Sequence, residues 1–301
     1  MYRRGLVPSL EIHPLSALRA EAASLLAERF ARQRAAEPLL PEVDDFEAHV
    51  PEDGHVATRG GKAVAYLGGS VDEEHKMARW LFAGHAAREP EALRDLFALQ
   101  AGETGVSRFM VTVPATNPDL VDVWFRLAFG CQAVWAVQEV EPPTPLEFDG
   151  TIRPATTEDT EAIIDFDEVL YVHQQASPSF SEFSAPPREE VRAEVWADEA
   201  FLPFVAERDG SPVGLLGLYR RPEGDLRVSA ANIDLAFAAT LPAAQGTGVG
   251  LALTTYAFAW AHENGFRSMT VDWRSVNLLS SRFWTKRGFR PQYLRLYRAV
   301  P

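Results

Sequence analysis

A glycine-rich turn between an apolar strand and an apolar helix constrains this chain more than any other feature. Residues 233–239 (Ile-Asp-Leu-Ala-Phe-Ala-Ala) predict a half-buried strand, and residues 251–263 carry apolar side chains at helical spacing before Asn264-Gly265. Between them, glycine recurs at every second position over residues 246–250. Because glycine has no Cβ atom, an anion can reach the amides at the positive end of the helix. The turn therefore predicts a phosphate site, although a glycine-rich turn without any ligand has the same composition.

The segment that follows strengthens this interpretation. Residues 272–277 predict a strand that ends in Asn277, and a short helix over residues 278–287 is closed by Gly288-Phe289. The order of strand, Gln-x-x-Gly-x-Gly, helix, strand, Asn, helix and Gly-Phe resembles the GCN5-related N-acetyltransferase (GNAT) superfamily. The openings at Ile152-Arg-Pro-Ala and Phe204-Val-Ala-Glu are similar to that family as well. The likeness therefore covers nearly all of residues 150–301.

The resemblance implies a fold, a co-substrate and a set of contacts. The fold class is α/β (α+β), with a mixed, mostly antiparallel twisted sheet flanked by helices. In the family, the glycine loop binds the pyrophosphate of acetyl-coenzyme A (acetyl-CoA), and the asparagine after the next strand helps to hold the pantetheine arm. The residues that the resemblance assigns to acetyl-CoA binding are Ala238, Ala239, Thr240, Gln245, Gly246, Thr247, Gly248, Val249, Gly250, Leu251, Asn277 and Trp284.

The first half of the chain repeats the second half. A shift of about 160 positions superposes Asn117 on Asn277 and Trp124 on Trp284. A repeat of this length indicates duplicated domains, because the units of a solenoid are shorter. We therefore expect two tandem GNAT-like domains, residues 1–145 and 146–301, joined by the proline-rich segment 141–150.

The two predicted domains differ at the glycine loop. Opposite residues 245–250, the first half has His85-Ala-Ala-Arg-Glu-Pro90. Side chains crowd this segment, Glu89 is negatively charged, and Pro90 has no N–H to donate. The first half is therefore predicted to be degenerate and to bind no coenzyme, with Asn117 and Trp124 as a cap and a core aromatic residue.

Acetyl transfer to an amine needs a base, because an alkylammonium has a pKa of about 10. Asp272 is the preferred candidate, since a carboxylate buried in an apolar strand would have a raised pKa. Asp234 on the preceding strand is the second candidate and shares a face with Asn232 at period two. Either aspartate could instead pair with Arg274 or Arg227, and a water relay could replace a side-chain base.

The sequence departs from the family at the residue that acts as the acid, which protonates the departing thiolate of the coenzyme. Many members carry a tyrosine seven residues after the asparagine, and this chain has Trp284 there. An indole N–H donates a hydrogen bond but does not act as an acid near neutrality. Ser280, Ser281 and Tyr256 are the alternative proton donors, and Ser280 could equally be a helix-cap or pantetheine contact.

These residues predict an N-acetyltransferase that moves an acetyl group from acetyl-CoA to a primary amine of a small molecule, by direct transfer in a ternary complex. The alternative is a catalytically weak module that binds or senses acyl-CoA. A nicotinamide enzyme fits poorly, because Leu251 stands where the third glycine of that fingerprint belongs. The segment 171–187, with His173 and Glu182, falls where the family places a variable acceptor wall.

Composition bounds the partners. The formal net charge of −13 argues against nucleic acid, which requires a basic face. No stretch of about 18 apolar residues predicts a membrane span, and no cysteine, histidine or carboxylate cluster has metal-ligand spacing. Cys131 is the single cysteine, which fits a reducing cytoplasm. The alanine- and arginine-rich composition suggests a bacterial source, and the sequence leaves open whether the chain is a monomer or a homodimer.

Overall fold

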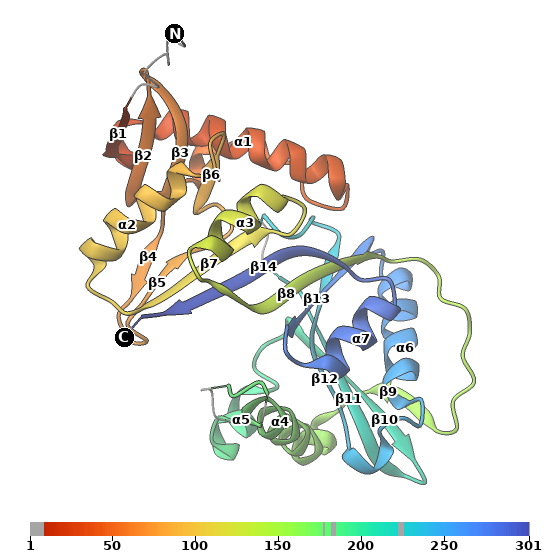
Figure 1. Ribbon diagram of the computed structural model, residues 1–301. Coiled ribbons are helices and arrows are strands. Elements are labelled where there is room, and N and C mark those ends of the chain that lie inside the picture. Colours follow the sequence, from red (N-terminus) through yellow and green to blue (C-terminus); the bar gives the residue numbers. More distant parts are fainter. Residues whose placement is uncertain (1–8, 177, 182–184, 222–225, 301) are drawn as a thin grey trace. The chain divides into compact units, whose positions relative to one another are not determined.

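The computed structural model describes residues 9–176, 178–181, 185–221 and 226–300. The chain divides into two compact units, which Figure 1 shows with all their elements. The first unit comprises Met1–Trp135 together with Pro291–Pro301, and the second comprises Ala136–Arg290. Among the described residues, no helix is both long enough and apolar enough to cross a bilayer.

The first unit combines two groups of strands with three helices. Strands β1 (Leu10–Pro14), β2 (Gly54–Arg59), β3 (Lys62–Gly68) and β6 (His85–Ala87) form an antiparallel sheet in that order. Strands β4 (Ser70–Asp72), β5 (Met77–Trp80), β7 (Arg108–Pro114) and β14 (Arg290–Ala299) follow one another in a second sheet; β5 and β7 pair in parallel, whereas β4–β5 and β7–β14 pair antiparallel. The helices are α1 (Arg19–Ala36), α2 (Ala92–Thr104) and α3 (Pro118–Arg126), with 3-10 turns at Leu15–Ala17 and Glu47–His49.

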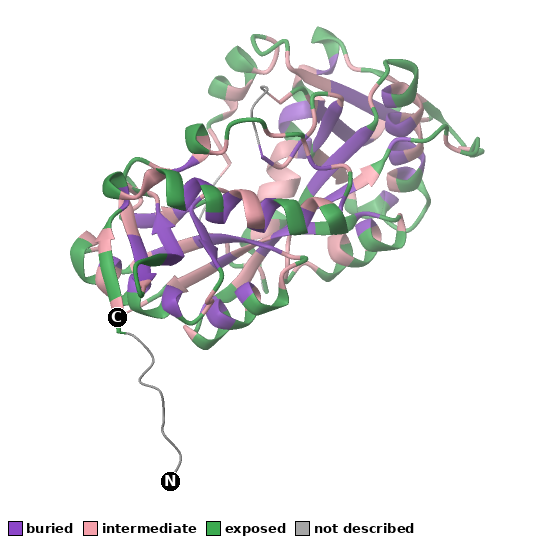
Figure 2. Ribbon diagram, turned by 90° about the horizontal axis from the view of Figure 1, so that it is seen from above, coloured by how far each residue is buried: buried purple, intermediate pink, exposed green. Residues whose placement is uncertain are grey.

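The alternation of side chains along β2 explains how α1 and α2 pack in this unit. Val56 belongs to a core cluster with Leu25 and Leu26 of α1. The next residue, Ala57, belongs to a cluster with α2 and with Trp124 of α3. Since successive residues of a strand point to opposite faces, α1 covers one face of this sheet and α2 covers the other. Figure 2 shows the strands largely buried and the outer surfaces of the helices exposed.

The second unit is a sheet with helices on both faces. Its strands follow the order β13 (Ser268–Arg274), β12 (Asn232–Thr240), β11 (Ser211–Tyr219), β10 (Phe201–Arg208) and β9 (Thr151–Pro154). Strand β8 (Gly130–Glu139) lies beside β13, and its residues 136–139 belong to this unit. Strands β9 to β12 pair antiparallel, and β12 pairs with β13 in parallel. The helices are α4 (Thr160–Gln175), α5 (Arg188–Glu194), α6 (Val249–Glu263) and α7 (Leu278–Lys286), with 3-10 turns at Thr157–Asp159 and Pro242–Ala244.

Neighbouring residues of β10 bind the two large helices of this unit. Val205 packs in a cluster with Ile163 and Phe166 of α4. The ring of Phe204 contacts Tyr256 and Trp260 of α6, at centroid distances of 5.4 and 5.7 Å. Helices α4 and α6 therefore cover opposite faces of the sheet.

The predicted repeat is visible in the elements themselves. Strands β7 and β13, helices α3 and α7, and strands β8 and β14 each begin 160 residues apart. Gly105 and Gly265 both have left-handed backbone angles, with φ of 64° and 79°. Asn117 and Asn277 each cap the N-terminus of the helix that follows. The two halves of the chain therefore share one plan of strand, capped helix and closing strand.

The bounds of the compact units differ from the predicted domains 1–145 and 146–301. The last strand of the chain, β14, pairs with β7 and belongs to the first unit, whereas residues 136–145 belong to the second. Because β8 and β14 occupy equivalent places in the repeat, local sequence does not specify that β14 pairs with β7 and that β8 lies beside β13. Tertiary pairing decides this.

Candidate functional site

Strands β12 and β13 separate part-way along their length. They pair from Asn232 opposite Ser268 to Leu235 opposite Val271, and β12 then continues to Thr240 paired with β11. The register between β11 and β12 shifts at the point of separation, which leaves Ala236 as an extra residue. Residues 238–240 border the opening that results and line a cavity.

The glycine loop, residues 245–251, follows β12 directly. Gly246 and Gly248 have φ of +76° and +90°, and a Cβ atom added at either would meet nothing within 4 Å. Helix α6 begins at Val249, so the N–H groups of its first turn have no acceptor within the helix. These groups lie at the positive end of the helix, where an anion is favoured; the anion site itself stays a prediction.

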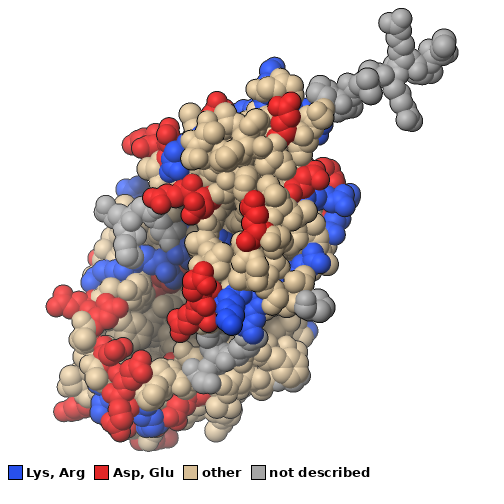
Figure 3. Space-filling view, turned by 90° about the vertical axis from the view of Figure 1, so that its left-hand side faces the viewer, with Lys and Arg blue, Asp and Glu red and all other residues tan. Residues whose placement is uncertain are grey.

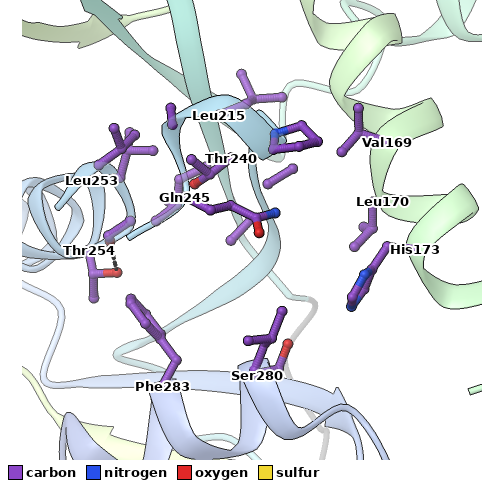
Figure 4. A pocket seen from close by; sticks show the side chains of 18 of the residues that line it. Val169, Leu170, His173, Leu215, Thr240, Gln245, Leu253, Thr254, Ser280 and Phe283 are labelled. Atoms are coloured by element: carbon purple, nitrogen blue, oxygen red, sulfur yellow. Dashed lines mark hydrogen bonds between the residues drawn. The ribbon is translucent and has the colours of Figure 1, made fainter. Parts of the chain in front are cut away.

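A cavity of about 1070 Å³ joins the opening of β12 to the glycine loop, α4 and α7. Figure 4 shows the side chain of Gln245 pointing into it, with Ser280 and Phe283 on α7 and Val169, Leu170 and His173 on α4. Of the residues that the resemblance assigns to acetyl-CoA, all except Thr247 line this cavity. Thr247 instead donates through its hydroxyl to the carbonyl oxygen of Ala244 at 2.7 Å and accepts from Arg208.

Helix α7 brings Asn277 and Trp284 to the cavity. The side-chain oxygen of Asn277 accepts hydrogen bonds from the amides of Leu279 and Ser280, at 3.1 and 3.2 Å, which leaves its amide group available to donate. Trp284 is buried and packs edge-on against Phe283 and Phe289. Asn277 therefore orients α7, and Trp284 is mainly a packing residue in the position where many GNAT members have tyrosine.

Asp234, one of the two predicted bases, is a buried ion-pair partner. Its carboxylate accepts a hydrogen bond from Arg221 and another from the hydroxyl of Thr270 at 2.6 Å. The amide of Asn232 donates to the same hydroxyl at 3.0 Å, which confirms that Asn232 and Asp234 share a face. Asp234 does not line the cavity, and its partner is Arg221 rather than Arg274 or Arg227.

Asp272, the preferred base, is exposed on β13 and does not line the cavity. The expected rise of its pKa through burial therefore has no basis in the structure. Its charge acts on Arg274, where burial lowers the pKa of the guanidinium and the neighbouring carboxylate opposes that shift. The expected burial is wrong because Asp272 lies where β13 has already left β12, and the role of Asp272 as a base stays a prediction.

The three predicted proton donors are separated. Ser280 lines the cavity at the start of α7. Ser281 is exposed and does not line it. Tyr256 packs on Phe204 and lines a separate pocket beneath residues 142–148. Among these candidates, only Ser280 has access to a ligand in the main cavity.

Helix α4 supplies a wall that the sequence interpretation only partly anticipated. His173 lines the cavity, and its imidazole points into it in Figure 4. Glu182, the other polar residue expected there, lies outside the described residues. The further wall residues share one helical surface, whose spacing of three and four was a detectable signal: Asp165, Glu168, Val169, Val172 and Ala176.

Helix α5 controls the charge of this wall. Arg188 forms ion pairs of 2.9 Å with both Asp165 and Glu168, and of 3.1 Å with Glu161. Hydrogen bonds to these carboxylates, first of all Glu168, raise the pKa of Arg188. On the face shown in Figure 3, acidic and basic side chains likewise lie interspersed.

The corresponding segment of the first unit lacks the features of the glycine loop. The amides of Arg88 and Glu89 both donate to the carbonyl oxygen of Val64, at 2.8 and 3.2 Å. The Glu89 side chain pairs with Arg59 at 2.9 Å, and the Arg88 side chain pairs with Glu28. Residues 85–87 form strand β6 rather than the expected loop. The donors that would bind a phosphate are thus already used.

Comparison with known proteins agrees with this geometry. Residues 169–289 match the model of the acetyltransferase (GNAT) family. This chain carries a GNAT-family domain. Among curated proteins, no sequence matches the chain. Within the described residues, no cluster of three or more histidine, cysteine or carboxylate side chains could hold a metal ion.

Solved structures extend the similarity beyond the GNAT domain to the whole chain. A GCN5-related N-acetyltransferase from Sphaerobacter thermophilus is 13% identical, with a TM-score of 0.62 over 97% of this chain and 96% of that one. A tandem GNAT protein from the clavulanic acid biosynthesis pathway is 14% identical, with a TM-score of 0.52 over 97% and 99%. A GNAT-family acetyltransferase from Colwellia psychrerythraea is 12% identical, with a TM-score of 0.54 over 97% and 100%. The predicted tandem GNAT fold is confirmed.

Proposed function

We propose that the chain is an N-acetyltransferase that moves an acetyl group from acetyl-CoA to a primary amine of a small molecule, in a ternary complex. The observation that carries this proposal is the meeting of two features in one cavity. The unpaired amides at the start of α6 border it, and so does the stretch of β12 that has left β13. The first feature suits a pyrophosphate and the second suits the amide-bearing arm of the coenzyme.

The residues present fit acetyl-CoA. Open space beside Gly246 and Gly248 admits phosphate oxygens to the backbone amides. Peptide groups of residues 238–240 would pair with the pantetheine arm, and the free amide of Asn277 would donate to it. The bound thioester would supply an activated acyl carbon, and a backbone N–H of β12 would stabilise charge on its oxygen.

His173 is our proposed base in place of Asp272. Imidazole is the side chain that most readily exchanges a proton near neutral pH, and His173 faces the cavity from α4. The amine nitrogen bonds to the acyl carbon as the carbon–sulfur bond breaks, and His173 removes the proton that the nitrogen loses. The hydroxyl of Ser280 would donate a hydrogen bond to the departing thiolate, whose thiol has a pKa of about 8.5.

The second candidate function is a module that binds or senses acyl-CoA with weak turnover. The observation that favours it is the burial of Trp284 at the place of the usual tyrosine. Without an acid, the rate would fall by roughly 10²–10⁴-fold and turnover would persist. A sensor of acyl-CoA needs only to bind it and does not need rapid turnover.

Release of free thiol from acetyl-CoA, measured with a panel of primary amines, separates the two candidates. Amine-dependent release together with the acetylated product supports the transferase. Tight binding of acetyl-CoA by calorimetry without amine-dependent release would support the sensor. Absence of binding would contradict both.

A further inference from the structure

The acceptor wall contains two acidic residues that share one arginine partner, so that one of their two negative charges is offset. Asp165 and Glu168 line the cavity from α4, and Arg188 of α5 pairs with both at 2.9 Å. A polycationic amine, such as a polyamine or an aminoglycoside, would need carboxylates that are available to bind several ammonium groups. In this wall, an ammonium group of such a polyamine could bind Asp165 or Glu168 only by displacing the guanidinium of Arg188.

The other ionisable side chains of the described wall do not supply a negative charge. His173 is neutral or cationic, and Arg287 is cationic. The guanidinium of Arg287 lies 3.4 Å from the centroid of the Phe283 ring and donates to the carbonyl oxygen of Phe283 at 3.0 Å. Among the described residues that line the cavity, every carboxylate therefore has an arginine partner.

The α4 wall and the facing start of α7 are otherwise apolar and partly open to water. Val172 of α4 is 66% exposed and Leu279 of α7 is 64% exposed, although both line the cavity. Val169 and Leu170 of α4 line it as well. Large apolar side chains left in water at the rim of a cavity indicate a ligand that covers them.

We propose that the acceptor is an apolar primary amine with a single ammonium group, and that Arg188 determines this specificity by offsetting one of the two negative charges of Asp165 and Glu168. The inference rests on the proposed acetyltransferase function and specifies its substrate class. Arg188 acts through the two carboxylates, so it is a specificity-determining residue and not a catalytic one.

The test compares two amines in thiol-release assays on the full chain: 2-phenylethylamine, which is apolar with one charge, and spermidine, which is polycationic. The unmodified protein should have the higher kcat/KM with 2-phenylethylamine. Arg188→Gln frees two carboxylates and should raise the spermidine-to-phenylethylamine ratio of kcat/KM by about 5-fold, the size expected of a partly exposed charge. Added salt should reduce the change.

Arg192→Gln is the matched control. Arg192 also lies on α5 and pairs with Glu161 at 2.7 Å, but Glu161 does not line the cavity. Arg192→Gln should leave the spermidine-to-phenylethylamine ratio of kcat/KM unchanged. Arg188→Lys keeps the positive charge, so its ratio should lie close to that of the unmodified protein. If Arg188→Gln and Arg192→Gln lower both activities equally, Arg188 only holds α5 in place and the proposal is overturned.

A second pair of variants tests the apolar contact. Val172→Thr replaces a methyl group with a hydroxyl of similar size and should raise KM for 2-phenylethylamine by about 3-fold, with little effect on acetyl-CoA. Val276→Thr, at an exposed valine that does not line the cavity, should have no effect. An unchanged KM in Val172→Thr would contradict the apolar acceptor.

The outcomes separate this inference from the proposed function. Transfer to spermidine in preference to 2-phenylethylamine would overturn the substrate class and leave the acetyltransferase intact. Transfer to neither amine, nor to any member of the wider panel, would overturn both.

Discussion

Arg208 holds Thr247 of the glycine loop with two hydrogen bonds, to its hydroxyl at 2.7 Å and to its carbonyl oxygen at 2.9 Å. A third bond joins Arg208 to the carbonyl oxygen of Asp149 at 2.9 Å. The loop that would bind the pyrophosphate is therefore fixed from outside the cavity by a residue at the end of β10.

Arg208→Met is expected to weaken acetyl-CoA binding, because the loop must then be ordered when the ligand binds. Loss of about 1 kcal/mol of hydrogen bonding corresponds to a roughly 5-fold rise in Kd, measurable by calorimetry. Arg208→Lys keeps the charge but cannot donate two hydrogen bonds in the geometry of the guanidinium. It should bind acetyl-CoA nearly as weakly as Arg208→Met does. Full affinity in the lysine variant would show that charge alone matters.

Gly250 offers a direct test of the anion site. It lies in the first turn of α6, and a Cβ there meets the Phe283 ring at an ordinary 3.5 Å, so the backbone tolerates a side chain. Gly250→Asp places a carboxylate beside the proposed pyrophosphate, and Gly250→Asn is its neutral isostere. We expect the aspartate variant to bind acetyl-CoA at least about 10-fold more weakly than the asparagine variant, in proportion to about 1.4 kcal/mol of repulsion. If the aspartate and asparagine variants bound acetyl-CoA with equal affinity, the pyrophosphate would not lie beside residue 250.

His173→Gln tests the proposed base. The variant should lose about 10²-fold or more in kcat and the rise of rate with pH that deprotonation of a base produces, and it should bind acetyl-CoA normally. Asp272→Asn serves as the comparison, because Asp272 is exposed and lies outside the cavity wall. A pH profile altered by Asp272→Asn and unaltered by His173→Gln would return the role to Asp272.

The first unit should not bind the coenzyme. The backbone amides of Arg88 and Glu89 already donate to the carbonyl oxygen of Val64, and Pro90 has no backbone N–H to donate. Calorimetry should therefore find one acetyl-CoA per chain. A stoichiometry of two would mean that the segment rearranges on binding.

His85 makes the stability of the protein depend on pH. It is fully buried, and both ring nitrogens are unpartnered among the described residues. Burial, with a smaller contribution from Arg29, lowers its pKa well below the usual value of 6.5. The unfolded chain then binds a proton that the folded chain does not. The stabilisation is complete above about pH 6.5 and is lost as the pH falls.

The loss from this one residue should be about 1 kcal/mol between pH 6.5 and 5.5. Urea unfolding of the natural protein and of His85→Leu at both pH values measures it, since contributions of all other groups cancel in the difference. Identical pH dependence in the two proteins would mean that His85 is protonated, or accessible, in the folded state.

The sequence by itself determined the local elements and the glycine loop. Strand β12, helix α6 and the left-handed Gly265 follow from apolar spacing and from backbone freedom, which neighbouring residues encode. The internal repeat was also readable, because equivalent residues keep a constant offset. The residues that the family resemblance assigns to acetyl-CoA line one cavity, except Thr247.

Tertiary structure decided what depends on residues far apart in the chain. It placed β14 in the first unit, paired Asp234 with Arg221, exposed Asp272 where two strands diverge, and brought His173 to the cavity. Strand pairing and ion pairing are choices among many partners of similar local character. Only the packing of the whole fold selects one of them.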